Sequence, residues 1–226
     1  MKPVLAVPVL NRPDLFRRMR DSIDIDVRLL VIDNSGTGLT RGLVPASAIL
    51  APPNNLGVAA SWNLAIKCYP QEPYWLFANA DTEFAPGDLA RLVEATESGA
   101  WGWVGMMGDW RAFGLTAATV ERVGLFDENY HPIYCEDADY ERRCTLAGIP
   151  WGSIKGATTH AGSVCLSDHR KDNARTYPAN VHRFERKWGT GVRGSGGFLL
   201  PFDDGGRLAD GTQPDLQTLR ANAWNP

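Results

Sequence analysis

The 226-residue sequence lacks several features that would assign it to a class at once. No run approaches the roughly 18 consecutive apolar residues of a membrane span, so we expect no transmembrane segment. The four cysteines form no C-x-x-C pair, which argues against a zinc ribbon or a thioredoxin motif and favours a reducing, cytoplasmic location. The apolar opening segment breaks at Asn11 without a cleavage pattern, so we interpret it as a strand rather than a signal peptide.

Strong charge of one sign is also missing. The chain has 23 basic and 26 acidic residues, a formal net charge of −3, and we therefore expect no nucleic-acid partner. The motifs G-x-x-x-x-G-K-[ST] and G-x-S-x-G do not occur, and no G-x-G-x-x-G follows the first expected strand. Their absence removes most support for a P-loop ATPase, a classical dinucleotide-binding domain and an α/β-hydrolase.

Strand and helix patterns alternate along the chain. We expect strands at Val4–Leu10, Arg28–Ile32, Ala48–Leu50, Tyr74–Ala78, Trp101–Met107, Trp110–Leu115 and Trp151–Lys155. We expect helices at Pro13–Ile23, Val58–Lys67, Pro86–Glu97, Thr116–Val123, Glu136–Ala147 and Asn173–Trp188. This alternation predicts an α/β fold with a mostly parallel central sheet flanked by helices.

Polar residues follow several of the expected strands. Asp33, Asn79 and Asp81 would lie at the carboxyl ends of the strands, where such sheets bind ligands. Asp81 could hold a hard divalent cation, although Asn and Asp are also common turn residues. His160 follows a later strand; a lone histidine there is more often a surface residue than a ligand, but with Asp81 it forms a candidate Mn²⁺ or Mg²⁺ ligand pair.

Three acids, Glu136, Asp137 and Asp139, begin an expected helix. Favourable interaction with the helix dipole explains one or two of them. Three neighbouring carboxylates also repel one another, which a cation or a substrate could relieve, and such a cluster suits a general base. The 167–187 stretch carries a net charge of +3; it could neutralise a diphosphate or simply be a solvated helix face. Within it, Tyr177, Phe184 and Trp188 are expected to be core anchors.

Taken together, the motifs resemble the GT-A glycosyltransferases of glycosyltransferase family 2 over residues 3–160. The matching segments are Val7–Arg12, Val31–Ser35, Asn54–Asn63, Leu76–Asp81, Gly124–Glu128, Glu136–Gly148 and His160. A closing segment, Asn180–Gly189, is similar to the end of the core in some members. Each segment alone is weak, and the family's order of segments carries the resemblance.

The resemblance implies a role for each site residue. The nucleotide of the donor would be bound by Pro8, Asn11, Arg12, Asp33, Asn63 and Asn79, with Asp33 accepting from a uracil-type N–H. Asp81 and His160 would hold Mn²⁺ or Mg²⁺, and Asp137 would be the general base, whose pKa Glu136 and Asp139 beside it could raise. Asn79 stands where the family has the first acid of its D-x-D motif, which should weaken cation affinity.

The activity implied is inverting transfer of a hexose from a UDP- or dTDP-linked donor. The acceptor would be a hydroxyl on a glycan, a lipid-linked glycan or a protein. Two alternatives stay open: a non-catalytic module that binds a nucleotide-sugar or glycan, and a sugar nucleotidyltransferase, which normally has a glycine-rich loop after the first strand. We expect a catalytic domain over residues 1–189 and a glycine-rich tail, flexible or ordered against a partner, over residues 190–226.

Overall fold

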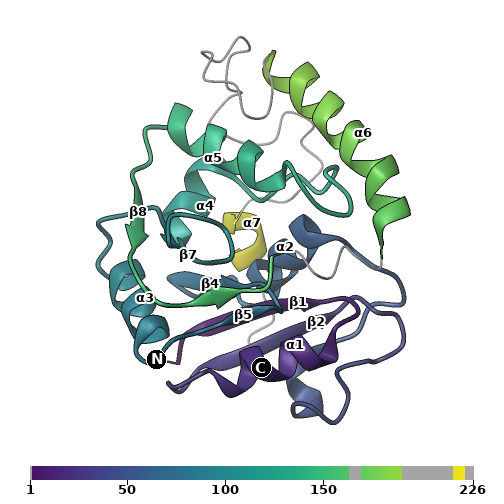
Figure 1. Ribbon diagram of the computed structural model, residues 1–226. Coiled ribbons are helices and arrows are strands. Elements are labelled where there is room, and N and C mark those ends of the chain that lie inside the picture. Colours follow the sequence, from purple (N-terminus) through teal and green to yellow (C-terminus); the bar gives the residue numbers. More distant parts are fainter. Residues whose placement is uncertain (1, 163–168, 190–215, 222–226) are drawn as a thin grey trace.

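The first strand, β1 (Val4–Val9), is buried on both faces, and this sets the layered architecture of the computed structural model (Figure 1). Val4 and Ala6 pack in one apolar cluster, whereas Leu5 and Val7 pack in another. Successive side chains of a strand point to opposite faces of its sheet, so β1 belongs to two cores at once. The sheet must therefore be covered by helices on both sides.

A sheet of seven strands has the order β3-β2-β1-β4-β7-β6-β8. Its other strands are β2 (Arg28–Asp33), β3 (Ile49–Leu50), β4 (Tyr74–Ala78), β6 (Trp103–Met106), β7 (Ala112–Thr116) and β8 (Trp151–Ile154). β7 runs antiparallel to both of its neighbours, and the remaining pairs are parallel. The predicted fold class, α/β with a mostly parallel central sheet, is confirmed.

Helices cover both faces of this sheet. On one face lie α1 (Pro13–Asp21) and α3 (Asp88–Glu97), whose Phe16 and Leu89 enter one core. On the other face lie α2 (Val58–Cys68), α4 (Ala117–Val123) and α5 (Glu136–Leu146). The short 3₁₀ helix η1 (Ala46–Ala48) directly precedes β3 in the chain. The bulk of the second core is aromatic: Trp62, Phe77, Phe113, Phe126 and Tyr140 pack ring against ring.

The structure describes residues 2–162, 169–189 and 216–221. In these ranges, no helix combines the length and the apolar character needed to cross a bilayer. Helix α7 (Leu216–Ala221) falls in the predicted tail, and there Leu216 is buried in the core and Arg220 Nε donates to Pro70 O at 2.9 Å. The predicted flexibility therefore does not apply to α7. The other tail residues lie outside the described ranges, and the boundary at residue 189 stays a prediction.

Two features differ from the sequence-based expectation. Helix α6 (Arg170–Trp188) begins before the expected Asn173, because its first turns are largely exposed and carry little apolar periodicity. A second sheet, of two strands, pairs β5 (Thr82–Glu83) with β9 (Thr159–His160) in antiparallel fashion. Strands of two residues are too short to produce an alternating pattern, so the sequence could not predict this sheet.

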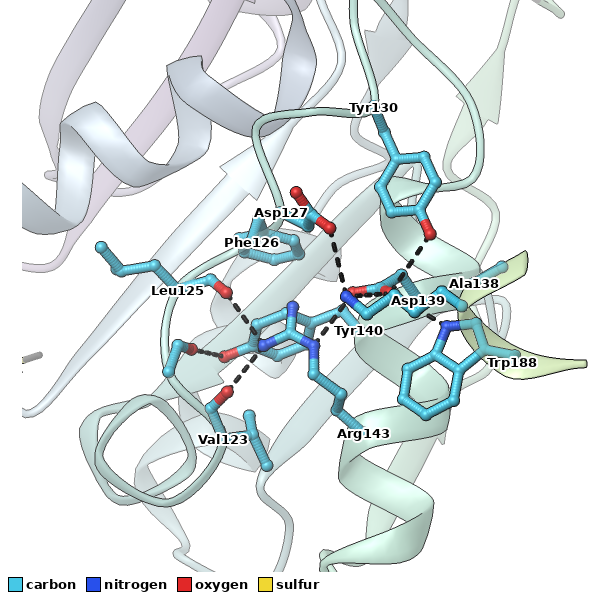
Figure 2. Close-up of polar contacts among 12 residues, drawn as sticks. Val123, Leu125, Phe126, Asp127, Tyr130, Ala138, Asp139, Tyr140, Arg143 and Trp188 are labelled. Carbon is cyan, nitrogen blue, oxygen red and sulfur yellow. Dashed lines mark hydrogen bonds and ion pairs between the residues drawn. The ribbon is translucent and has the colours of Figure 1, made fainter. Parts of the chain in front are cut away.

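A buried charge network joins α5 to the loop before it and to α6 (Figure 2). Arg143 Nε donates to Asp139 Oδ2 at 2.9 Å, one helical turn apart, and both side chains are almost completely buried. The Arg143 guanidinium also donates to the carbonyl oxygens of Val123 and Leu125. The helix is thereby fixed to the chain segment that follows α4.

Helix α6 joins the same network through its last turn. Lys187 Nζ lies 2.8 Å from Asp139 Oδ1 and 3.1 Å from Asp127 Oδ2, and Trp188 Nε1 donates to Asp139 Oδ1 at 3.0 Å. Arg183 also pairs with Asp127, at 3.3 Å. Removing one partner from such a buried set would leave an uncompensated charge, so these contacts hold α5 and α6 in a fixed relation.

Asp127 should make stability depend on pH. Burial raises the pKa of Asp127, but the charge of Lys187 and the hydrogen bonds from Asn129 outweigh it and lower the pKa from 3.8 to about 2. A carboxyl group with a lowered pKa stabilises the fold above its unfolded pKa and loses that contribution as the pH falls through the folded value. We expect Asp127→Asn to cost about 2 kcal/mol of unfolding free energy at pH 7.

Urea unfolding of both proteins at several pH values measures this. The difference between wild type and Asp127→Asn should shrink as the pH falls from about 4 to about 2, following the pKa values. The exposed Asp26, whose side chain is 70% accessible, provides the control substitution Asp26→Asn. A stability difference that stays constant down to pH 2 would contradict the assigned role of Asp127.

Candidate functional site

A cleft of about 380 Å³ opens beyond the carboxyl ends of β1 and β4. The strand order reverses at β1, because β2 and β3 lie on one side of it and β4 on the other. Open α/β sheets bind ligands at such a switch point. The floor of the cleft includes Pro8, Asn34 and the Asn79–Asp81 turn. The predicted location of the site, at the strand ends, therefore coincides with this cleft.

Two elements form the walls of the cleft. One is the start of α2, where Val58 N donates to Pro132 O at 2.8 Å and His131 Nε2 lies 3.1 Å from Asn55 O. Gly57 has φ +80°, and a Cβ there would lie 2.8 Å from Pro132 O, so only glycine permits this close approach. The other wall is the first turns of α6, which contribute Asp172, Asn173, Arg175 and Thr176, together with His169 directly before the helix.

Asp81 and His160 meet in the cleft. The pairing of β5 with β9 sets Thr82 opposite His160, which brings His160 Nε2 to 3.0 Å from Asp81 Oδ1. The same ring nitrogen lies 3.3 Å from Asn79 Nδ2. The structure thus brings together the two predicted cation ligands and the residue at the first position of the D-x-D motif. The unpredicted small sheet is what joins them.

The hydrogen bonds of His160 define its tautomer. The Gly162 amide donates to His160 Nδ1 at 3.1 Å, so Nδ1 carries no proton and Nε2–H donates to Asp81. Binding a cation through Nε2 would require the proton to leave that nitrogen. A hard cation would find carboxylate oxygen at Asp81 and amide oxygen at Asn79. In the described chain, no three His, Cys, Asp or Glu residues converge as a complete metal site, so ligand or water oxygens would have to complete the coordination.

Asp33 is buried and fully engaged inside the protein. Its Oδ1 accepts from the amide and hydroxyl of Ser35, and its Oδ2 accepts from the amide and hydroxyl of Thr40. Burial raises the pKa of Asp33, but these hydrogen bonds together lower it below its usual value. A nucleobase N–H would have to share an oxygen that already accepts two bonds, and the nucleobase contact of Asp33 stays a prediction.

The other predicted nucleotide residues have different surroundings. Pro8 and Asn79 line the cleft, whereas Asn11, Arg12 and Asn63 are outside its lining. Arg12 pairs with Asp14 at 2.6 Å. Asn63 is buried and exchanges hydrogen bonds with the backbone of Phe126. Asn63 therefore holds the segment beneath the cleft, and its predicted part in closing the site could only be indirect.

Sequence reasoning gave no role to Asn34, although it lines the cleft. Its Nδ2 donates to Ser61 Oγ at 2.8 Å, and its Oδ1 accepts from Leu56 N at 3.1 Å. These bonds tie the end of β2 to the start of α2. The sequence feature that could have identified Asn34 is its position directly after Asp33, at the end of a strand. His131 and His169, which also line the cleft, gave no comparable signal because both lie in loops.

The three acids of α5 occupy different environments. Asp139 belongs to the buried network, and Glu136 is only 4% exposed. Burial and then the charge of Asp137 raise the pKa of Glu136 well above its usual range. Burial also raises the pKa of Asp137, against the Ala138 amide that donates to it at 2.7 Å. Neither Glu136 nor Asp137 lines the cleft, but Ile133, a few residues earlier, does.

The basic residues that α6 contributes to the 167–187 stretch lie in two different environments. Arg175 lines the cleft, whereas Arg183 and Lys187 pair with buried acids and are turned into the protein. Of the predicted core anchors, Phe184 and Trp188 are buried, but Tyr177 is 39% exposed. The expectation for Tyr177 was wrong because α6 leaves this side chain partly in solvent, where its ring meets the Tyr134 ring edge-on.

Comparison with known proteins agrees with this architecture. Residues 5–106 match the model of glycosyl transferase family 2. A mannosyltransferase from Pyrobaculum calidifontis, solved with GDP-Man and Mn²⁺, aligns with a TM-score of 0.63 at 15% identity, over 82% of this chain and 65% of its own. TarS from S. aureus aligns with a TM-score of 0.52 at 14% identity, over 68% of this chain and 58% of its own.

A third solved structure extends the comparison. Glucosyl-3-phosphoglycerate synthase from Mycobacterium tuberculosis, solved with Mn²⁺, UDP and phosphoglyceric acid, aligns with a TM-score of 0.58 at 15% identity, over 80% of this chain and 78% of its own. No curated protein matches the sequence. The chain spans less than two thirds of the length of the mannosyltransferase and of TarS. The chain thus shares the fold of these solved glycosyltransferases, and its residues 5–106 are similar to glycosyl transferase family 2.

Proposed function

We propose that the chain is an inverting glycosyltransferase that moves a hexose from a nucleotide-sugar to an acceptor hydroxyl. One observation carries the proposal: Asp81 and His160 meet in a cleft at the switch point of the sheet, near the acid-bearing start of α5. The similar structures support it, since they were solved with GDP-Man or UDP and with Mn²⁺. The volume of the cleft is in the range of small-molecule sites.

In this proposal the donor lies across the strand ends. Pro8 and Asn34 border the nucleoside, and Asp33 holds the loop beneath it or shares a carboxylate oxygen with a UDP- or dTDP-type base. Asn11 and Arg12 lie next to this floor in sequence, and Asn63 supports the site from below. The diphosphate faces Arg175 on α6, whose positive charge would stabilise the leaving group, and His169 directly before α6.

Asp81, with Asn79 and His160, would hold a divalent cation, Mn²⁺ or Mg²⁺. A bound cation would neutralise charge on the departing diphosphate. The role of this chain is to present the Asp81 carboxylate in a fixed direction, through the bond from His160. Because Asn79 replaces an acid, the cation would depend on oxygens of the donor to complete its coordination.

Asp137 would be the general base, with Glu136 beside it. The acceptor oxygen attacks the anomeric carbon and passes its proton to the Asp137 carboxylate, while the bond from that carbon to the phosphate oxygen breaks. The products are the new glycoside and a nucleoside diphosphate. The raised pKa of Asp137 brings it closer to neutrality, where a base is most effective. Burial and the charge of Asp137 raise the pKa of Glu136 well above its usual range, and we assign the proton-accepting role to Asp137.

Donor identity is tested by a thermal-shift screen of UDP-, dTDP- and GDP-sugars, each with and without Mn²⁺. A ligand at 100 times its Kd stabilises the folded state by about 2.7 kcal/mol, which raises the Tm of a chain of this size by roughly 5–10 °C. We expect one donor to do so, and more strongly with Mn²⁺. If no nucleotide-sugar raised the Tm, the proposal that this cleft binds the donor would be rejected.

The cation site predicts a difference between two substitutions. Asp81→Asn removes the carboxylate and should abolish the Mn²⁺-dependent part of UDP binding. His160→Gln keeps an N–H that can donate to Asp81, so its effect should be smaller. Titration calorimetry of UDP with Mn²⁺ and with EDTA measures both, and Glu94→Gln, an exposed carboxylate on α3, is the control. Unchanged Mn²⁺-dependent binding by Asp81→Asn would remove Asp81 from the cation site.

The base assignment predicts that Asp137→Asn binds the donor like wild type but loses transfer. Proton abstraction by a positioned base contributes about 10²–10⁴-fold to the rate, so a loss in that range is expected. Nucleoside diphosphate release measures turnover, and the thermal shift measures donor binding. Glu141→Gln on the same helix is the comparison. Wild-type turnover by Asp137→Asn would show that another group takes the proton.

A further inference from the structure

The turn that leads into α5 is held in an unfavourable conformation. Tyr134 and Cys135 both have left-handed backbone angles, φ 78° and 77°, although neither is glycine. Such residues cost free energy and persist only when surrounding contacts hold them. The turn is followed directly by Glu136 and Asp137. Its conformation therefore determines where the first turn of α5 points.

One side chain of α6, Asn180, binds the backbone of this turn. Asn180 Nδ2 donates to Ile133 O at 3.0 Å and to Tyr134 O at 3.2 Å, and Asn180 is 4% exposed. Two consecutive carbonyl groups thus accept from one amide. A side chain that cannot donate would leave both carbonyl oxygens without this partner in a buried place, which costs free energy.

The same helix also reaches the cleft. Asn173 and Thr176 line the cleft about one to two turns before Asn180, and Ile133 lines it from the loop. At its far end, α6 is fixed to Asp139 by Lys187 and Trp188. Asn180 therefore lies on a helix whose position is already set, between the wall of the cleft and the start of α5.

We propose that Asn180 is a positioning residue: by binding the carbonyl groups of Ile133 and Tyr134, it holds the turn that aims Asp137 at the acceptor. The inference rests on the proposed function, because it assigns a purpose to the direction of Asp137. Asn180 touches no substrate in this role. It acts through the backbone of the turn, and its loss should affect proton transfer rather than donor binding.

The first test is the pH profile of kcat for Asn180→Ala. A misaimed base can cost about 10²-fold in rate, and we expect kcat to fall by that order while the KM for the donor changes little. Release of the turn should also admit water to Asp137, which lowers its pKa. The charged and titratable groups that couple to this end of α5 include Glu136, Asp139, Glu141 and Arg142 on the helix, Cys135 at its cap, Tyr130 in the preceding loop and Lys187 of α6, which pairs with Asp139.

A base acts when deprotonated, so the acidic limb of the profile should move to lower pH. Partial unfolding would lower the whole profile without moving the limb, which separates positioning from a merely structural role. Asn180→Gln keeps the amide and should restore part of kcat. Arg186→Ala, an exposed change on the same helix, is the control. An unmoved limb in Asn180→Ala would overturn the proposal.

The second test does not depend on turnover. Cys135 is 3% exposed within the turn, so its alkylation by N-ethylmaleimide, followed by peptide mass spectrometry, reports opening of the turn. We expect faster labelling of Cys135 in Asn180→Ala than in wild type, with Cys144 as the internal control. Equal labelling of Cys135 would overturn the proposal. If the alanine variant does not fold, Asn180→Ser, which keeps one donor, gives the same comparison.

A turnover assay of the wild type distinguishes a failure of the proposed function from a failure of the positioning role of Asn180. Wild-type protein is assayed for nucleoside diphosphate release from UDP-GlcNAc, UDP-glucose and GDP-mannose with Mn²⁺. If none is consumed, the proposed function fails and the role of Asn180 in aiming a base fails with it, even if Cys135 labels faster. If a donor is consumed but the acidic limb of Asn180→Ala does not move, only the positioning role fails.

Discussion

The buried ion pair between Asp139 and Arg143 is the constraint on which the functional half of the molecule depends. Burying charges costs free energy that their attraction only repays when hydrogen bonds satisfy the remaining groups. Here Lys187 and Trp188 from α6 contact Asp139 Oδ1, and the carbonyl groups of Val123 and Leu125 accept from Arg143 Nη1, while Arg143 Nη2 has no hydrogen-bond partner in the described part of the chain. The network therefore forms only when α5, α6 and that segment are all in place. It specifies one arrangement of the cleft wall and the acid-bearing helix.

The network also explains why three neighbouring acids take on different tasks. Glu136 and Asp139 lie three residues apart, on the face of α5 that is turned into the protein, and Tyr140 and Arg143 continue that face. Asp137 lies off this face, and its carboxylate accepts from the local amide of Ala138. A sequence shows three equivalent carboxylates, and the rotation of the helix separates them. The i,i+4 spacing of Asp139 and Arg143 was the signal that one acid had an internal partner.

Sequence patterns predicted most of the sheet and its helices because the strands are buried runs and the helices have apolar periodicity. Three parts of the site were beyond such patterns. The β5–β9 pairing depends on two-residue strands, the internal bonds of Asp33 depend on how the 35–40 loop folds back, and the polar start of α6 has little periodicity. In each case a contact distant in sequence decides the outcome, and residue types alone do not encode which partner is chosen.

The charges in the cleft fit the replacement of an acid by Asn79. An acid there would add a negative charge beside a donor diphosphate, and more basic residues or a more tightly bound cation would be needed to balance it. Arg183 and Lys187 are withdrawn into the network, so among the lining residues of the described chain Arg175 supplies the permanent positive charge. Because Asn79 is neutral, the cleft carries one negative charge fewer than it would with an acid at this position, and few of the residues that line it are basic. Under the proposed function, the neutral Asn79 and the inward-turned basic residues of α6 would be two parts of one electrostatic arrangement.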